Sequence, residues 1–370
     1  MDANNLLPKL LLGLIPGVGA AVARSLMARA GDPASIFRLK RRDLLSIPGV
    51  GNQLAERILK HNLLGRAEEE IRFMEKERVD CRFLFDPDYP RQLVQCPDAP
   101  ILLFIKGEMP GEECRYLSII GTRNPTARGQ RVTREFVQEL ALKNPSTVII
   151  SGLAYGIDVQ AHLAALNAGL KTIAVLGHGF HTLYPAVHRS ISNRITGQGA
   201  LLSDFFSNNQ PDPRNFIRRN RIIAGLSEAT LVIESGVKGG AIVTAEMANS
   251  YNRDVFAVPG RPDDLMSKGC NHLIRTSQAS LAETVEDIQY LLGWSPPVQG
   301  REVRQRVLFT ELDPEEKAVV DALQEGPASV DQIGRSTGIP VQKMAAVLLN
   351  LEFKQAICAL PGNYYTLNES

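Results

Sequence analysis

Arginine and glycine residues gather in four short segments whose side chains and backbone suit the binding of phosphate groups. These segments are GTRNP at 121–125, SGLAYGID at 151–158, DPRNFIRRNRIIAG at 212–225 and SGVKGGAIVTAE at 235–246. They supply Thr122, Arg123, Ser151, Gly152, Arg214, Arg218, Arg219, Arg221, Lys238, Gly239, Gly240 and Thr244. A phosphate backbone is bound by delocalised cations and by exposed backbone N–H groups, with glycines keeping bulky side chains away. The pattern therefore predicts a site that holds phosphate and carries no catalytic residue.

The third segment carries the most specific of the four signals. Arg214, Arg218 and Arg221 are spaced by four and three residues, which places them on one face of a helix, with Arg219 adjacent. No acidic residue occurs between positions 213 and 227. A face that is merely solvated would more often mix the two signs of charge, so the cluster favours a polyanionic ligand.

Other polar residues in these segments have simpler interpretations. Asp158 is at the start of a predicted helix, where a carboxylate is usually a capping group. His162 follows four residues later, but two side chains without a third ligand make a weak metal site. The five cysteines are scattered without a CxxC pair, which favours free thiols in a reducing cytoplasm. We therefore predict no metal and no cofactor.

Each phosphate-binding segment follows or flanks an apolar run that is typical of a buried strand. Six such runs lie within 116–123, 147–152, 172–177, 200–204, 230–236 and 254–260, separated by helical patterns such as 127–143. Continuous apolar strands alternating with helices predict an α/β fold, a doubly wound Rossmann-like parallel sheet. In that fold the loops at the carboxyl ends of the strands form the ligand-binding edge.

Residues 1–80 are predicted to be all-α and contain an internal repeat, IPGVG at 15–19 and again at 47–51, each followed by a helical pattern. The repeat resembles a tandem helix-hairpin-helix, in which glycine permits a tight turn and N–H groups point toward a phosphate. The segment holds 13 basic and 10 acidic residues, a small surplus. Compact turns that serve only protein contacts therefore remain the alternative.

The rest of the chain divides into three further parts. Residues 81–295 form the predicted Rossmann-like core, and 296–306 are predicted to be a linker because they lack apolar periodicity. Residues 307–370 follow the order helix, short helix, longer helix and hairpin, which predicts a winged-helix domain. Residues 306–370 hold five basic and nine acidic residues, so this domain is expected to contact protein rather than read duplex DNA.

The overall charge argues against a basic surface over the whole chain, and the N-terminal segment argues against a membrane-directed one. The formal net charge is only +1 over 370 residues, so any nucleic-acid footprint must be local. The apolar stretch near the N-terminus is interrupted by Pro8, Lys9 and Pro16. It is expected to be neither a signal peptide nor a membrane span.

Several motifs together resemble a known family. The runs SIIGTR, SGLAYGIDVQAH, TIAVLGHG, FIRRNRIIAGLS, LVIESGVKGGAIVTAE, FAVPG and SKGCNHLI, in this order, are similar to those of the DNA processing protein A (DprA, also called Smf) family. The resemblance covers the whole chain, from the helix-hairpin-helix domain to the winged-helix tail. In this chain Tyr155 stands where the family often has arginine, which indicates a stacking or structural contact in place of a cationic one.

The resemblance implies a function without catalytic turnover. It implies a cytoplasmic homodimer that binds single-stranded DNA and loads the RecA recombinase on incoming strands in natural transformation. Carried over by motif, the groove would be lined by Arg123, Ser151, Gly152, Arg218, Arg219, Asn220, Arg221, Lys238, Gly239, Gly240 and Thr244.

Two enzymatic alternatives remain. GGAIVTAE, ending at Glu246, is similar to an element of Rossmann-like phosphoribohydrolases that cleave nucleoside monophosphates, with Glu246 and Arg123 as the candidate catalytic pair. That function explains neither the hairpin repeat nor the tail. A repair nuclease or glycosylase built around the repeat would need a carboxylate cluster or a catalytic lysine, which residues 1–80 do not suggest.

Overall fold

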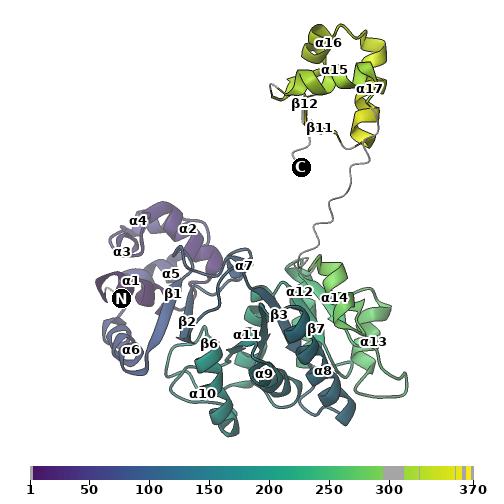
Figure 1. Ribbon diagram of the computed structural model, residues 1–370. Helices are drawn as coiled ribbons and strands as arrows, with labels where there is room; N and C mark the ends of the chain where they lie inside the picture. The colour runs from purple at the N-terminus through teal and green to yellow at the C-terminus, as the bar shows by residue number, and fades with distance from the viewer. Residues whose placement is uncertain (1–2, 295–311, 325, 355, 361–363, 368–370) are drawn as a thin grey trace. The chain divides into compact units, whose positions relative to one another are not determined.

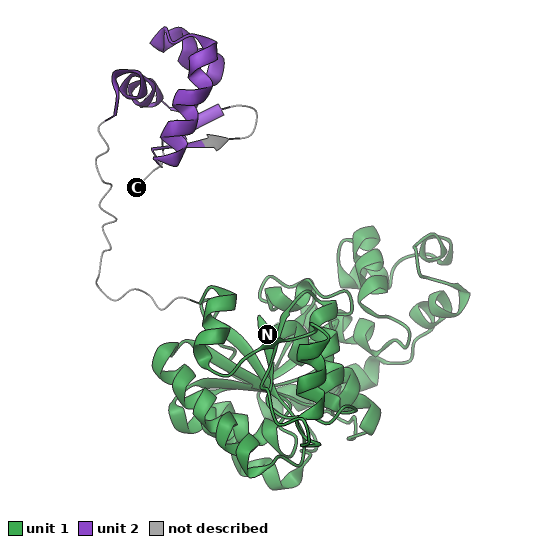
Figure 2. Ribbon diagram, turned by 90° about the vertical axis from the view of Figure 1, so that its right-hand side faces the viewer, with its two compact units in different colours: residues 1–296 green, residues 297–370 purple. Residues whose placement is uncertain are grey.

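The computed structural model describes residues 3–294, 312–324, 326–354, 356–360 and 364–367. The chain forms two compact units, residues 1–296 and 297–370 (Figure 2). The predicted linker at 296–306 lies outside the described residues. Among the described helices, none has the length and apolar composition needed to cross a bilayer.

The larger unit is built on a nine-stranded sheet in which the six predicted strands are present. They are β3 (Arg115–Ile120), β4 (Thr147–Ser151), β5 (Lys171–Val175), β6 (Gly199–Ser203), β7 (Ala229–Val232) and β8 (Asp254–Ala257). These strands are parallel and lie in the order β6-β5-β4-β3-β7-β8. The chain winds outward from β3 in one direction and then from β7 in the other, which confirms the doubly wound fold.

Three further strands lie at the ends of this sheet. β1 (Val79–Phe83) and β2 (Leu102–Gly107) form an antiparallel pair, and β2 is also antiparallel to β6, with Lys106 opposite Leu201. At the other end, β9 (Ser280–Leu281) is parallel to β8. The sheet is therefore mixed rather than wholly parallel, because the segment before β3 adds strands at its edge.

Helices cover both faces of the sheet, as alternating strand residues require (Figure 1). On one face α8 (Ala127–Lys143), α9 (Ile157–Ala168) and α14 (Val285–Leu292) pack against residues such as Leu117 and Ile119. On the other face α7 (Arg91–Val94), α11 (Pro213–Leu226), α12 (Gly240–Ser250) and α13 (Lys268–Arg275) pack against residues such as Tyr116 and Ile120. The short helix η1 (Ala186–His188) leads into α10 (Arg189–Gln198), which precedes β6.

The N-terminal helices contain the predicted repeat. They are α1 (Ala3–Leu14), α2 (Ala20–Ala30), α3 (Pro33–Ile36), α4 (Arg41–Leu45), α5 (Asn52–Leu59) and α6 (Leu64–Glu77). In the two hairpins Gly17 and Gly49 have φ of +98° and +85°, values that favour glycine. Val18 N–H donates to Ile15 O at 3.2 Å, and Val50 N–H donates to Ile47 O at 3.1 Å. The equivalent geometry confirms a tandem helix-hairpin-helix.

These helices lie beside β1 and β2 at one end of the sheet (Figure 1), and they share a hydrophobic core with it. Leu10, Leu26 and Ile58 are fully or almost fully buried in the same cluster as Phe83 of β1 and Phe104 of β2. The predicted boundary between residues 80 and 81 falls within β1. The helices and the sheet therefore belong to one compact unit.

The smaller unit has the element order of a winged helix. It contains α15 (Pro314–Leu323), β10 (Ala328–Ser329), α16 (Val330–Thr337), α17 (Val341–Phe353), β11 (Ile357–Leu360) and β12 (Tyr364–Leu367). The strands form a sheet in the order β10-β12-β11 around a separate core that includes Val319, Ile333 and Leu351. Residues 361–363, which connect the two strands of the predicted hairpin in sequence, lie outside the described residues.

Candidate functional site

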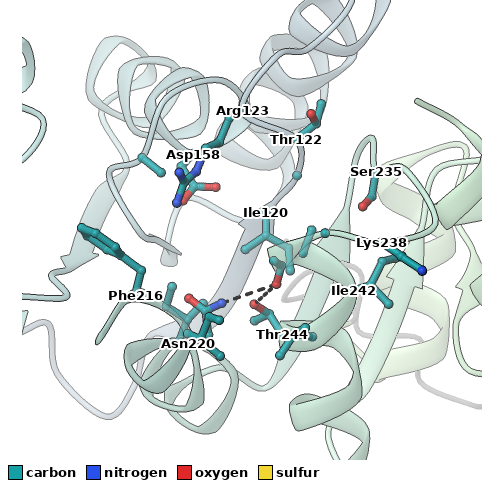
Figure 3. A pocket seen from close by; sticks show the side chains of 18 of the residues that line it. Ile120, Thr122, Arg123, Asp158, Phe216, Asn220, Ser235, Lys238, Ile242 and Thr244 are labelled. Carbon is teal, nitrogen blue, oxygen red and sulfur yellow. Dashed lines mark hydrogen bonds between the residues drawn. The ribbon is translucent and has the colours of Figure 1, made fainter. Parts of the chain in front are cut away.

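A crevice of about 960 Å³ opens where the winding direction of the sheet reverses, between β3 and β7 (Figure 3). This is the switch point at which open α/β sheets bind ligands, because neighbouring loops diverge there. The crevice is lined by the loops after β3 and β7 and by parts of α11 and α12. Of the predicted site residues, those that line it are Thr122, Arg123, Arg219, Asn220, Lys238, Gly239, Gly240 and Thr244. Ser151, Gly152, Arg214, Arg218 and Arg221 do not line it.

The loop after β3 is held rigidly and presents Arg123 to solvent. Thr122 N–H donates to Glu234 O at 2.7 Å, and Ile157 N–H donates to Thr122 O at 3.1 Å. The buried Glu234 carboxylate also accepts a hydrogen bond from Thr126 N–H at 2.9 Å. Arg123 is exposed and lies over the Phe216 ring, with no ion-pair partner among the described residues. Its guanidinium group is therefore free to bind an anion.

The loop after β4 packs against the loop after β3 and helps to hold it in place. Ser151 is fully buried, and its Oγ donates to Ile119 O at 2.7 Å. Gly152 N–H donates to the Asp158 carboxylate at 3.1 Å. Gly156 has φ of +82°, and a Cβ there would collide with the backbone of Thr122 and Arg123. Ser151 and Gly152 thus position the loop, and the structure does not bring the Ser151 side chain to the crevice surface.

Arg219 is at the wall of the crevice but its side chain is turned inward, with only 3% of the residue exposed. Its guanidinium group donates to Gly152 O at 2.8 Å and to Val175 O, which ties together the carboxyl ends of β4 and β5. Burial lowers the pKa of Arg219 to about 10, and burial raises the pKa of Asp158, an effect that Arg219 opposes. The predicted DNA contact of Arg219 does not fit this geometry, because the group is already surrounded by protein acceptors.

The arginines of α11 have an acidic partner that lies outside their own segment. Asp204, directly after β6 and 1% exposed at its side chain, pairs with Arg221 at 2.5 Å and with Arg218 at 3.4 Å. Arg221 is 11% exposed at its side chain, whereas Arg218 is 60% exposed. The prediction that Arg214, Arg218 and Arg221 together form one face for a polyanion is therefore wrong. Arg214 and Arg218 are at the surface, whereas Arg221 holds α11 to the sheet.

The loop after β7 brings backbone N–H groups to the crevice. α12 begins at Gly240, and its N-cap residue is Gly239, which provides no side-chain cap. The first N–H groups of a helix lack partners within the helix, so this end favours an anion. Lys238 is exposed beside it, with no ion pair among the described residues. Thr244 Oγ1 donates to Gly240 O at 2.8 Å, and Asn220 Nδ2 donates to the same oxygen at 3.4 Å (Figure 3).

Aromatic rings form part of the crevice that the charge pattern alone did not identify. Tyr184 and Phe216 line it with their ring centroids 5.5 Å apart, and Tyr184 is 45% exposed. His178 Nε2 accepts a hydrogen bond from Tyr184 N–H at 3.1 Å, and burial lowers the pKa of His178. For Phe216 the available signal was its place within NFIRRN, two residues before Arg218.

The crevice combines cationic side chains, a helix N-terminus and partly exposed aromatic rings. Cations and N–H groups bind phosphates, and aromatic rings stack with nucleobases. Within the described part of the chain, no group of three or more histidine, cysteine, aspartate or glutamate residues is arranged to hold a metal ion. The surface suits a flexible polyanion that carries planar groups.

Comparison with known proteins agrees with this description. Residues 80–293 match the family model of DNA recombination-mediator protein A. The chain belongs to this family. Residues 310–363 match the DprA winged helix domain, and residues 9–61 match the SAM-like helix-hairpin-helix tandem. The family resemblance inferred from the sequence motifs is thereby confirmed.

Individual relatives extend this family match over most of the chain. Protein Smf of Synechocystis is 33% identical over 388 residues, covering 95% of this chain and 96% of the relative. The X-ray structure of DNA processing protein A from Streptococcus pneumoniae has a TM-score of 0.62 at 30% identity, covering 76% of this chain and 95% of that one. DNA processing protein A from Helicobacter pylori has a TM-score of 0.51 at 26% identity, covering 59% and 96%. That structure is described as revealing a single-stranded DNA binding mode.

Proposed function

We propose that the chain binds single-stranded DNA without sequence preference in the crevice between β3 and β7. The observation that carries this proposal is the meeting of Arg123, Lys238 and the α12 N-terminus with the rings of Tyr184 and Phe216 in one crevice. Cations and N–H groups recognise every phosphate alike, and every base has a face that can stack, so such a site is tolerant of sequence.

The same features favour a single strand over a duplex. Paired bases are stacked on each other and cannot lie on Tyr184 or Phe216, whereas the bases of a single strand can. The winged-helix unit offers little to a duplex, because two of its lysines are already in ion pairs. Lys343 of α17 pairs with Glu315, and Lys354, the C-cap residue of α17, pairs with Glu316. A helix that reads the major groove needs free basic groups for the phosphates.

The biological role that we propose is that of a recombination mediator in natural transformation. In this role the chain, as a cytoplasmic homodimer, would cover incoming single strands and load the RecA recombinase on them. The family description and the relatives named DNA processing protein A support the role. The winged-helix unit would then serve a protein contact rather than duplex DNA.

The binding proposal is tested by a salt titration with oligothymidylate and with a duplex of equal length. For each phosphate neutralised, the logarithm of single-strand affinity should fall with the logarithm of salt with a slope of about −0.7. We expect tighter binding to the single strand at moderate salt. Equal affinity for the two forms would contradict the proposal.

RecA loading needs a separate measurement. RecA filament formation is followed on a single strand that is already covered by a single-strand-binding protein, with and without this chain. We expect faster filament formation with the wild-type chain and no acceleration with Arg123→Ala. Acceleration by the variant equal to that of the wild type would argue against a role for the crevice in loading.

A nucleoside-monophosphate phosphoribohydrolase-like enzyme is the second candidate function. It is favoured by one observation, that Glu246 is exposed and lines the same crevice as Arg123. A carboxylate beside an arginine can orient and activate a nucleotide for hydrolysis. Release of free base from nucleoside monophosphates by the wild-type chain but not by Glu246→Gln would establish this activity.

A further inference from the structure

Outside the crevice, the N-terminal helices contain a buried carboxylate. Glu70 of α6 is only 2% exposed. Its carboxylate accepts hydrogen bonds from Ser207 N–H at 2.9 Å and from Ser207 Oγ at 2.7 Å. It also pairs with Arg66 at 2.5 Å. A buried carboxylate is costly unless it is fully paired, so this group fixes α6 to the segment that follows β6.

The contacts around Glu70 extend to Phe206 and Asn208, the neighbours of Ser207 in the loop between β6 and α11. Arg66 donates to Asn208 Oδ1 at 2.9 Å and lies over the Phe206 ring. Phe206 in turn packs edge-on against Phe104 of β2, with ring centroids 5.3 Å apart. The loop at 205–209 is therefore attached to α6 by charge and hydrogen bonds, and to β2 by aromatic packing.

A series of hydrogen bonds connects this loop to Tyr184 at the rim of the crevice. Ser207 O accepts a hydrogen bond from His181 N–H at 3.1 Å, and Asn209 O accepts one from Gly179 N–H at 2.9 Å. His178, the residue before Gly179, accepts the hydrogen bond of Tyr184 N–H. The position of Tyr184 therefore depends on the loop that Glu70 holds.

The loop is also connected to Phe216 directly, through the chain that follows it. The same loop continues into Pro211 and Pro213, which line the crevice, and then into Phe216 on the first turn of α11. Both aromatic rings of the crevice thus lie on segments anchored at residues 205–209. Arg123 and Lys238 lie on other loops, which follow β3 and β7 and are not attached to α6 by the hydrogen bonds above, although the guanidinium group of Arg123 lies over the Phe216 ring.

We propose that Glu70 is a positioning residue. By holding residues 205–209 against α6, it fixes the positions of Tyr184 and Phe216, the residues on which bases would stack. The inference rests on the proposed single-strand binding at this crevice. Its consequence is that the two parts of DNA recognition are separable: Glu70 controls contacts to bases, and Arg123 and Lys238 control contacts to phosphates.

The test compares Glu70→Gln with Glu77→Gln in the full chain. Glu77 is on the same helix and pairs with Lys106 of β2 at 3.0 Å, and among the described residues no hydrogen bond or ion pair joins it to residues 205–209. Affinity is measured for oligothymidylate and for a strand of equal length that lacks bases. In Glu70→Gln we expect the preference for the base-containing strand to fall by about tenfold, while the salt dependence stays unchanged. Glu77→Gln should retain the preference.

A second readout does not depend on DNA. Hydrogen exchange of the Gly179 and His181 amides should be faster in Glu70→Gln than in Glu77→Gln. Ser207→Ala, which removes one of the bonds to Glu70, provides a milder variant should Glu70→Gln fold poorly, and it should shift both readouts in the same direction. Unchanged amide exchange, or an unchanged base preference in a folded variant, would overturn the inference. Absence of single-strand binding by the wild type would instead contradict the proposed function, and amide exchange would still test the positioning.

Discussion

Arg123 and Arg219 reach the same crevice but differ in what surrounds their guanidinium groups. Arg219 is enclosed by the carbonyl oxygens of Gly152 and Val175, whereas Arg123 has an aromatic ring beneath it and solvent above. A guanidinium group whose donors are already satisfied contributes to rigidity, and one with free donors can bind a phosphate. Residue type alone therefore did not distinguish the two roles.

This difference gives a prediction for single substitutions. Arg123→Ala and Lys238→Ala should each weaken single-strand binding, since loss of a charge-assisted contact costs about 1.5–3 kcal/mol. Neither should change the midpoint of urea unfolding appreciably, because both side chains are exposed. Binding is measured by fluorescence anisotropy with a labelled oligothymidylate.

Two further variants serve as controls for that prediction. Lys171→Ala removes an exposed lysine at the amino end of β5, the opposite edge of the sheet, and should bind DNA as the wild type does. Arg221→Ala should lower stability by about 3–5 kcal/mol, because it leaves the buried Asp204 carboxylate without its closest partner. A stable Arg221→Ala protein with selectively weak DNA binding would show that Arg221 contacts DNA and that its pairing with Asp204 contributes little to stability.

The buried His162 gives a prediction about pH. Its Nδ1 lies 2.7 Å from Thr172 Oγ1, and its Nε2 has no hydrogen-bond partner among the described residues. Burial lowers the pKa of His162 from 6.5 to about 3. Between these pH values the unfolded chain binds a proton that the folded chain excludes, so stability falls as pH falls through this window. The slope from this residue is up to about 1.4 kcal/mol per pH unit.

Urea unfolding of the wild type and of His162→Leu at pH 7 and at pH 5 measures this contribution. The variant should lose less stability than the wild type between the two pH values, whatever its stability at pH 7. Parallel loss in both proteins would place the titrating group elsewhere.

At the scale of elements, periodicity and apolar runs were sufficient to predict most of the core. The strands β3 to β8 and the full span of α8 follow from continuous apolar runs and from a 3.6-residue pattern, which depend on local sequence. The antiparallel pairing of β2 with β6 did not follow, because strand partners are chosen by tertiary packing. The pairing of Asp204 with Arg221 was missed for the same reason, since the two residues lie on different elements.

The start of α12 gives a prediction that separates stability from binding. A Cβ at Gly240 would meet only Asn220 Nδ2, at 4.0 Å, so alanine fits there in the free protein. Alanine is also the better helix former, and Gly240→Ala should leave stability unchanged or raise it by up to about 1 kcal/mol. The added methyl group would nevertheless keep a phosphate away from the first N–H groups of the helix, so we expect weaker DNA binding.

Gly65→Ala is the matched control for Gly240→Ala. Gly65 lies in α6, and a Cβ there would meet nothing within 4 Å. This variant should gain similar stability and bind DNA normally in the anisotropy measurement. Normal DNA binding by Gly240→Ala would mean that the α12 N-terminus does not contact the strand.

At the scale of the whole molecule, the two units differ in how much each offers to a polyanion. The larger unit holds the crevice, and its N-terminal helices share a core with β1 and β2. The smaller unit has its own core, and residues 306–370 carry nine acidic against five basic residues. The binding of single strands should therefore belong to the larger unit, with the smaller one free to contact another protein.

The final prediction is that residues 1–296 alone bind single-stranded DNA as tightly as the full chain, within about twofold, or about 0.4 kcal/mol. The fragment keeps the crevice and the helices that pack on β1 and β2, so its core remains complete. A fragment that begins at residue 81 should fold poorly instead, because it cuts β1 and uncovers Leu102 and Phe104, which are buried against those helices. Affinity for oligothymidylate is measured by anisotropy and folding by circular dichroism. A folded 1–296 fragment that fails to bind, together with strong binding by residues 297–370, would move the DNA site to the winged-helix unit.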